Sequence, residues 1–192
     1  MTFLPKSAIL SLEEIAVIAE RFIARGITKI RLTGGEPLVR RDIAELVKRL
    51  GHHIGAGLDE LTMTTNGNAL AQHAPAMVAA GIRRINVSLD SRDPETFRYI
   101  TRHGDVARVI EGILAARDAG LSVKINLVAL KGLNEHEIAP MLEWCIAERL
   151  DLTLIETMPL GQIDEDRADR FVPLTAVFDE LAGRFSLVRD TH

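Results

Sequence analysis

Cysteine is almost absent from this chain of 192 residues, because Cys145 is the only one. A single thiol excludes a disulfide framework and an all-cysteine metal site within the chain. We therefore expect a reducing, cytoplasmic location. Cys145 itself falls in the middle of an expected helix, which favours a buried and inert thiol.

Long apolar runs are also missing. No stretch approaches the roughly 18 apolar residues of a membrane span, and no basic region followed by an apolar segment marks a secretory signal. We therefore expect no membrane association. The net charge of −4 argues against a general nucleic-acid-binding protein. No linker rich in Gly, Ser or Pro divides the chain, so we expect one domain over residues 1–192.

The regular feature that is present is a repeated order of helix, glycine and strand. It occurs at 26–32 (GITKIRL), 81–89 (GIRRINVSL) and 120–130 (GLSVKINLVAL). Strands that alternate with helices of this length predict βαβ units and a parallel sheet. The predicted fold class is α/β with five clear strands, and residues 186–188 are a candidate for a sixth.

Two helix starts are marked by polar residues. Ser11, followed three residues later by Glu14, has the pattern of a capping box. Asn134 is expected to cap a helix over residues 135–149.

The most unusual stretch is residues 33–37 (TGGEP), directly after a predicted strand over residues 29–33. Two adjacent glycines leave the backbone uncovered and let a ligand approach main-chain groups closely. Glu36 places a negative charge beside that bare backbone. The stretch therefore suits a small polar ligand with a cationic group, although an ordinary turn between strand and helix explains the five residues equally well.

Polar residues also follow the other predicted strands. They are Thr64–Gly67, Ser88, Asp90 and Glu156–Met158. In parallel α/β folds and barrels, ligands bind at the carboxyl ends of the strands. Each cluster alone can be a structural turn, but four such clusters at one end of a sheet favour a ligand-binding face.

Several sequence motifs resemble one enzyme family. They are FLPK (3–6), KIRLTGGEPLVRRD (29–42), TTNG (64–67), RINVSLD (84–90), KIN (124–126), GLNEHEI (132–138) and IETMP (155–159). Together these resemble the radical S-adenosylmethionine (SAM) enzymes, and among them the GTP 3′,8-cyclases, which begin molybdenum cofactor biosynthesis. The resemblance implies a partial TIM-type barrel, with a parallel sheet of about five to six strands that lacks the family's first βα unit.

The same resemblance implies roles for individual residues. The implied SAM contacts are Gly34, Gly35, Glu36, Ser88 and Met158. The implied GTP contacts are Arg31, Thr64 and Lys124. Arg31 and Lys124 are cations on predicted strands and suit a triphosphate, although a solvated or ion-paired strand residue is the alternative. The implied reaction converts GTP to (8S)-3′,8-cyclo-7,8-dihydroguanosine 5′-triphosphate with a radical derived from SAM and with an electron donor as partner.

The chain also departs from the family. The CxxxCxxC loop that holds the family's first [4Fe-4S] cluster, and the three cysteines that hold its second, have no counterpart here. Without these cysteines the chain has no ligands for either cluster, and we expect no cyclase activity from this chain alone. His52-His53 have no second pair at ligand spacing, so we expect no metal site there either.

Three hypotheses about the function of the chain stay open. The chain can be part of a genuine cyclase, a non-catalytic remnant that binds SAM or a nucleotide, or a protein with another radical-SAM activity. Without a preceding βα unit, the strand at 29–33 would be an exposed sheet edge, which leaves self-association or a homodimer open.

Overall fold

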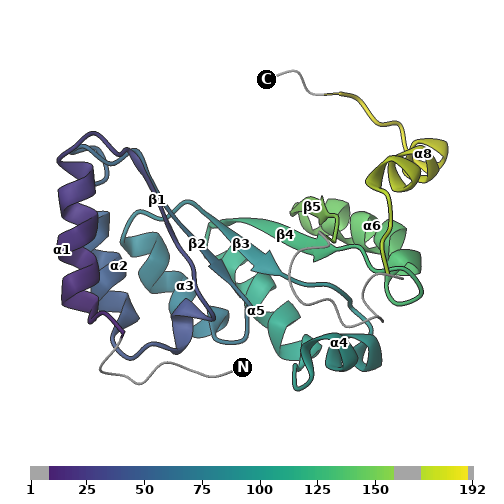
Figure 1. Cartoon of the computed structure of the whole chain (residues 1–192), viewed down its shortest axis with the longest axis horizontal. Helices are drawn as coiled ribbons and strands as arrows, with labels where there is room; N and C mark the ends of the chain where they lie inside the picture. Colours follow the sequence, from purple (N-terminus) through teal and green to yellow (C-terminus); the bar gives the residue numbers. More distant parts are fainter. Residues whose placement is uncertain (1–8, 158–169, 190–192) are drawn as a thin grey trace. The chain divides into compact units, whose positions relative to one another are not determined.

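The computed structural model describes residues 9–157 and 170–189. Helices and strands alternate along the chain, as Figure 1 shows. The described residues form two compact units, one built from residues up to Val87 with Arg108–Val123, the other from Ser88–Ala107 with residues from Lys124 onward. Within the described ranges, no helix is both long and apolar enough to cross a membrane.

Each unit combines strands with helices. The first contains α1 (Leu12–Ile23), β1 (Lys29–Leu32), η2 (Pro37–Val39), α2 (Ile43–Gly51), β2 (Glu60–Thr65), α3 (Leu70–Ala79), most of β3 (Arg84–Ser88) and most of α5 (Val106–Asp118). The second contains α4 (Pro94–Thr101), most of β4 (Ser122–Val128), η3 (Glu135–Glu137), α6 (Ile138–Glu148), β5 (Asp151–Ile155) and α8 (Leu174–Arg184).

The strands follow one another in the sheet in chain order, β1-β2-β3-β4-β5. The pairs β1–β2, β2–β3 and β4–β5 are parallel. The predicted α/β class with five parallel strands is therefore confirmed. Residues 186–188 form no strand, and β1 is an edge strand of the described sheet.

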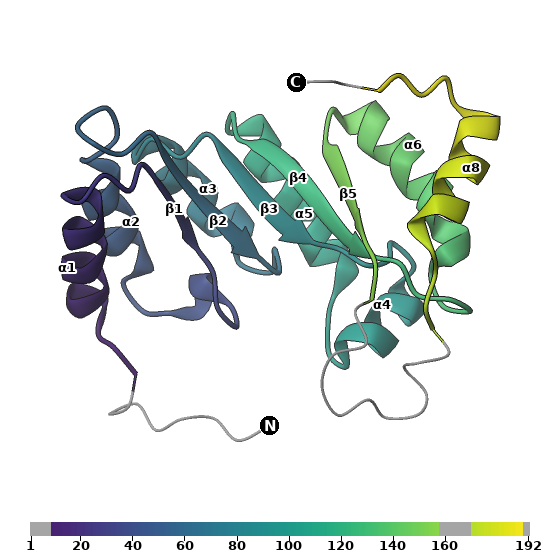
Figure 2. The same ribbon diagram turned by 45° about the horizontal axis from the view of Figure 1, so that its top comes forward.

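In the first unit, the sheet has one apolar face and one polar face, because side chains alternate along a strand. Leu61, Met63, Ile85 and Val87 are fully buried on the apolar face. Helices α2 and α3 run along one side of β1 and β2 (Figure 2), and α2 packs against both α1 and α3. The polar side chains of β1, β2 and β3 are left together on the opposite face.

The two predicted helix starts differ in outcome. The capping box is confirmed: Ser11 Oγ accepts a hydrogen bond from the Glu14 N–H at 3.1 Å, and the Glu14 carboxylate accepts one from the Ser11 N–H at 2.8 Å. The predicted cap at Asn134 is wrong. Its side chain makes no capping hydrogen bond, and the segment forms the short η3 before α6 begins at Ile138.

Asn134 instead joins two loops of the second unit. Its side chain is fully buried, donates hydrogen bonds to the carbonyls of Asp90 (2.6 Å) and Val128 (2.9 Å), and accepts one from the Leu130 N–H (2.8 Å). The Asp90 carboxylate accepts a hydrogen bond from the Val128 N–H at 2.8 Å. Burial raises the pKa of Asp90, although this hydrogen bond opposes the shift.

Asp90 is expected to make stability depend on pH. Because its pKa is higher in the folded state than in the unfolded state, the ionised carboxylate destabilises the fold, and this penalty grows as the pH rises through the two pKa values. Asp90→Asn keeps an acceptor oxygen for Val128 but removes the charge. We expect the variant to unfold at a higher temperature than the wild type at pH 7, with a difference that shrinks toward pH 4.

Thermal unfolding followed by circular dichroism across that pH range tests this expectation, with the exposed Asp118→Asn as the matched control. A lower unfolding temperature for Asp90→Asn at pH 7 would contradict it.

Candidate functional site

The turn after β1 presents bare backbone. A Cβ built at Gly34 or at Gly35 would meet no other atom within 4 Å, so both residues border open space. Gly34 has a φ of +152°, which side-chain-bearing residues rarely adopt. Main-chain N–H and C=O groups at this turn are therefore accessible to a ligand.

Glu36 fixes that turn to the end of β2. Its Oε1 atom accepts hydrogen bonds from the Leu38 N–H (3.0 Å) and the Thr65 hydroxyl (2.7 Å), and its Oε2 atom accepts one from the Asn66 N–H (2.6 Å). A carboxylate has about four acceptor positions, so these three bonds leave room for one further donor. Sequence reasoning missed this role, because the two partners at the end of β2 lie about thirty positions away.

The turn at the end of β2 is also held in place by a hydrogen bond and by close packing. The Thr65 hydroxyl also accepts a hydrogen bond from the Gly67 N–H at 3.1 Å. Gly67 has a φ of +81°, and a Cβ there would lie 2.9 Å from a methyl of Val109 and 3.0 Å from a methyl of Val87. Only glycine fits this position without a shift of its neighbours. The TGGEP and TTNG stretches therefore form one rigid pair of turns at the carboxyl ends of β1 and β2.

The polar face of the first unit begins with an ion-pair cluster near the start of the strands. Glu60 of β2 pairs with the Arg84 guanidinium of β3 through both of its oxygens and lies 3.9 Å from the Lys29 ammonium of β1. The hydrogen bond from Arg84 lowers the pKa of Glu60, with Coulombic help from Arg84, Lys29 and Arg31. Glu60 therefore neutralises one of the two cations at that end of the face.

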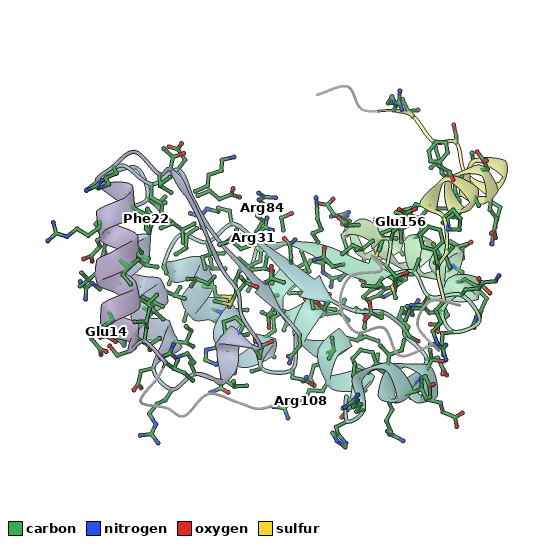
Figure 3. The ribbon with its side chains drawn as sticks, in the orientation of Figure 1. Glu14, Phe22, Arg31, Arg84, Arg108 and Glu156 are labelled. Carbon is green, nitrogen blue, oxygen red and sulfur yellow. The ribbon has the colours of Figure 1, made fainter. Side chains whose placement is uncertain are left out.

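Further along the same face, the predicted GTP contacts of this unit form no ion pair or hydrogen bond with a described residue, although the charge of Arg31 acts on Glu60. Arg31 is exposed on β1, and its side chain makes no hydrogen bond or ion pair with a described residue. Figure 3 labels it together with Arg84. Thr64 is half-buried and likewise forms no side-chain hydrogen bond within the described part of the chain. The first unit thus brings an available cation and an available hydroxyl onto one face, near the TGGEP turn.

The second unit holds other predicted contacts. Ser88 is exposed at the end of β3, and Lys124 is half-buried on β4 opposite Asp151 of β5. Glu156, directly after β5, accepts a hydrogen bond from the Leu174 N–H at 2.8 Å and so supports the start of α8. Met158, the remaining predicted SAM contact, lies outside the described residues.

The loop after β3 is tied down by Glu137. Its carboxylate accepts hydrogen bonds from the Ser91 hydroxyl (2.6 Å), the Arg92 N–H (3.0 Å) and the Asp93 N–H (3.4 Å). Together with Asn134, this residue gives the GLNEHEI stretch a structural role, which is to hold the loop that follows the RINVSLD strand.

The chain's thiol and histidines do not fit an iron–sulfur cluster. Cys145 is buried in α6, and burial raises its pKa to about 11, so it is a neutral thiol rather than the thiolate that ligates iron. His53 lies 3.7 Å from Glu20, whose carboxylate is also bound by Arg49. Among the described residues, no group of three or more His, Cys, Asp or Glu side chains is arranged to hold a metal ion.

Comparisons with known proteins identify the relatives of the chain. The chain is 55% identical over 192 residues to a GTP 3′,8-cyclase of Erythrobacter litoralis, and covers 100% of itself and 58% of that protein. It is 56% identical over 187 residues to a GTP 3′,8-cyclase of Rhizobium etli, covering 97% of itself and 54% of the relative. The chain thus spans about half the length of the curated relatives it matches. The resemblance predicted from the sequence motifs is confirmed.

The fold has relatives among solved structures. The crystal structure of Streptococcus suis SuiB bound to S-adenosylmethionine superposes with a TM-score of 0.69, over 91% of this chain and 41% of SuiB, at 18% sequence identity. At that identity the likeness shows the fold alone, and it agrees with the predicted partial barrel. Residues 2–145 match the Radical SAM superfamily. This chain therefore belongs to the radical SAM superfamily.

Proposed function

We propose that this chain is the SAM- and GTP-binding core of a GTP 3′,8-cyclase, a lyase of molybdenum cofactor biosynthesis. The observation that carries the proposal is the polar face of β1 and β2, where the side chains of Arg31 and Thr64 form no hydrogen bond with a described residue. The turn that follows β1 presents the bare backbone of Gly34 and Gly35. An unpaired cation suits a phosphate, and exposed main-chain groups suit a small zwitterion. The cyclase relatives, about 55% identical, favour GTP and SAM as these ligands.

SAM is expected at the TGGEP turn. Its amino group would donate to main-chain carbonyls at Gly34 and Gly35 and to the acceptor position that Glu36 has left. Ser88 and Met158, which belong to the second unit, are proposed as SAM contacts from the family resemblance alone. When bound and given one electron by a donor, SAM would supply the 5′-deoxyadenosyl radical that takes a hydrogen atom from C3′ of GTP. The protein's own part is to bind and orient the two molecules.

GTP is expected along the polar face of the first unit. Arg31 would pair with the triphosphate, and the Thr64 hydroxyl would donate to it or to the ribose. Lys124, in the second unit, is proposed as a further GTP contact from the family resemblance alone. Since the lone Cys145 supplies no ligand set for a [4Fe-4S] cluster, we assign no step to a cluster and expect this chain alone to lack cyclase activity. The second candidate function is a non-catalytic module that binds SAM or a nucleotide, and the available Arg31 on β1 supports it.

The proposal extends to the protein's location, its partners and its oligomeric state. We infer that it acts in the cytoplasm as a single core domain, takes small-molecule ligands rather than nucleic acid or membrane, and depends on an electron donor in its active form. A homodimer is also proposed, because β1 is an edge strand with an apolar groove along it.

The first test is GTP binding by the Arg31→Ala variant. Losing a hydrogen-bonded charge is expected to cost roughly 1.5–3 kcal/mol, about ten- to hundredfold in Kd. Isothermal titration calorimetry with GTP measures the effect, and Arg25→Ala, an exposed arginine outside the strand, is the matched control. Equal affinities of the Arg31 variant and the wild type would refute the assignment of Arg31.

The second test concerns Glu36. Glu36→Gln replaces one carboxylate oxygen by an NH2 group, which cannot accept a hydrogen bond. The variant therefore loses either the bond from the Asn66 N–H or the bonds that Oε1 accepts from Leu38 and Thr65. We expect a loss of roughly 1–2 kcal/mol in the free energy of unfolding and weaker SAM binding. Urea unfolding and calorimetry measure both, with the exposed Glu45→Gln as control. Unchanged stability and unchanged SAM affinity would show that the hydrogen bonds of Glu36 do not position the turn.

The third test concerns self-association. Ile18, Phe22 and Ile27 are 42%, 54% and 45% exposed beside the open edge of β1, and Figure 3 labels Phe22 on α1. Exposed apolar surface next to an unpaired edge strand favours association. We expect elution in size-exclusion chromatography to shift with concentration for the wild type and less for Phe22→Ser, with Val188→Ser behaving as wild type. A clean monomer at every concentration would count against the homodimer.

A further inference from the structure

Helix α5 lies directly against the TTNG turn that follows β2. Gly112 of α5 leaves no room for a side chain, because a Cβ there would lie 2.6 Å from the carbonyl oxygen of Gly67 and 3.2 Å from the Cβ of Leu70. That carbonyl is itself fixed, since it accepts a hydrogen bond from the Leu70 N–H at 3.1 Å, at the start of α3. The contact therefore brings two backbones together and requires glycine on the helix.

A second contact holds the same turn to α5. Arg108 donates a hydrogen bond from Nε to the carbonyl of Asn68 at 2.8 Å, and Figure 3 labels this arginine. The Asn68 N–H in turn donates to the side-chain oxygen of Asn66 at 3.0 Å. Arg108 and Gly112 are four positions apart and so lie on one face of the helix. This face of α5 thus meets the turn at two points.

The same turn anchors the TGGEP backbone. The Glu36 carboxylate accepts hydrogen bonds from the Thr65 hydroxyl at 2.7 Å and from the Asn66 N–H at 2.6 Å. A series of direct contacts therefore leads from α5 through Gly67 to Glu36, and from there to the bare backbone at Gly35. All of these residues belong to the first unit. Closely packed groups transmit a displacement rather than absorb it.

We propose that Gly112 is a positioning residue for the SAM site: α5, packed against the TTNG turn, sets where Glu36 holds the TGGEP backbone. The inference rests on the proposed function and deepens it, because it adds an element outside the strand ends that controls the geometry of the site. Since Gly112 contacts the turn, its effect on SAM passes through Glu36. A side chain at position 112 displaces the TTNG turn and, with it, the TGGEP turn.

Gly112→Ala tests the proposal, and Gly51→Ala is its matched control. Gly51 is the last residue of α2 in the same unit, and a Cβ there would overlap the carbonyl oxygen of Ala80, at the far end of α3 from the TTNG turn. Both variants press a helix against a backbone carbonyl, so both are expected to unfold at a lower temperature than the wild type. Only Gly112→Ala acts at the turn.

Calorimetry on the full chain measures the effect on SAM. We expect Gly112→Ala to weaken SAM binding by about tenfold, because small misplacements of binding groups are costly. Gly51→Ala is expected to bind SAM with the affinity of the wild type. Equal losses of SAM affinity in the two variants, or no loss in either, would overturn the positioning role.

Amide spectra recorded by NMR without ligand test the route itself. We expect Gly112→Ala to shift the backbone amides of Asn66 and of Gly34–Gly35, and Gly51→Ala to leave them in place. In a Glu36→Ala background, Gly112→Ala should still shift Asn66 but no longer Gly34–Gly35. A glycine that merely allows the helix to pack would change the unfolding temperature without moving the Gly34–Gly35 amides.

Arg108→Met is the second variant, for the case that Gly112→Ala does not fold. It removes the bond to the Asn68 carbonyl without introducing a clash, and we expect smaller shifts at the same amides. Gly34–Gly35 amides that stay in place in the folded variant would contradict the proposal. A wild type that bound no SAM would refute the proposed SAM site, and the ligand-free spectra would still decide whether α5 positions the turn.

Discussion

The carboxylate of Glu36 is the interaction on which the candidate site depends. It accepts hydrogen bonds from its own turn at Leu38 and from the end of β2 at Thr65 and Asn66. Hydrogen bonds to a charged acceptor are stronger than those between neutral groups. They hold the bare backbone of Gly34 and Gly35 beside the end of the neighbouring strand, so a ligand meets a preformed surface rather than a loose loop.

How much of the structure the sequence predicts depends on how far apart along the chain the interacting residues lie. The capping box of Ser11 could be predicted because it depends on residues three positions apart. The parallel sheet could be predicted because helices and strands alternate regularly along the chain. The roles of Asn134 and Glu36 could not. Asn134 looks like a helix cap in the sequence, but it bonds a carbonyl 44 positions away. Local pattern says nothing of such partners, which exist only once the loops have packed.

The candidate site follows the same division. The motifs placed Arg31 and Thr64 on or at the end of strands, but only the structure shows that they share one face and which groups on that face are paired. Glu60 and Arg84 neutralise each other near the strand starts, whereas Arg31 and Thr64 have no side-chain hydrogen bond among the described residues. Arg31 is exposed and Thr64 is half-buried, so both groups are open to a ligand, as a binding face requires.

The most direct test of this central claim is an NMR titration of the isotope-labelled chain with GTP and with SAM, followed through backbone amide shifts. If the polar face of β1 and β2 binds the nucleotide and the TGGEP turn binds SAM, GTP will shift the amides of Arg31 and Thr64, and SAM will shift those of Gly34 and Gly35. Saturating additions that leave all four amides unchanged, while shifts occur elsewhere or not at all, would contradict it.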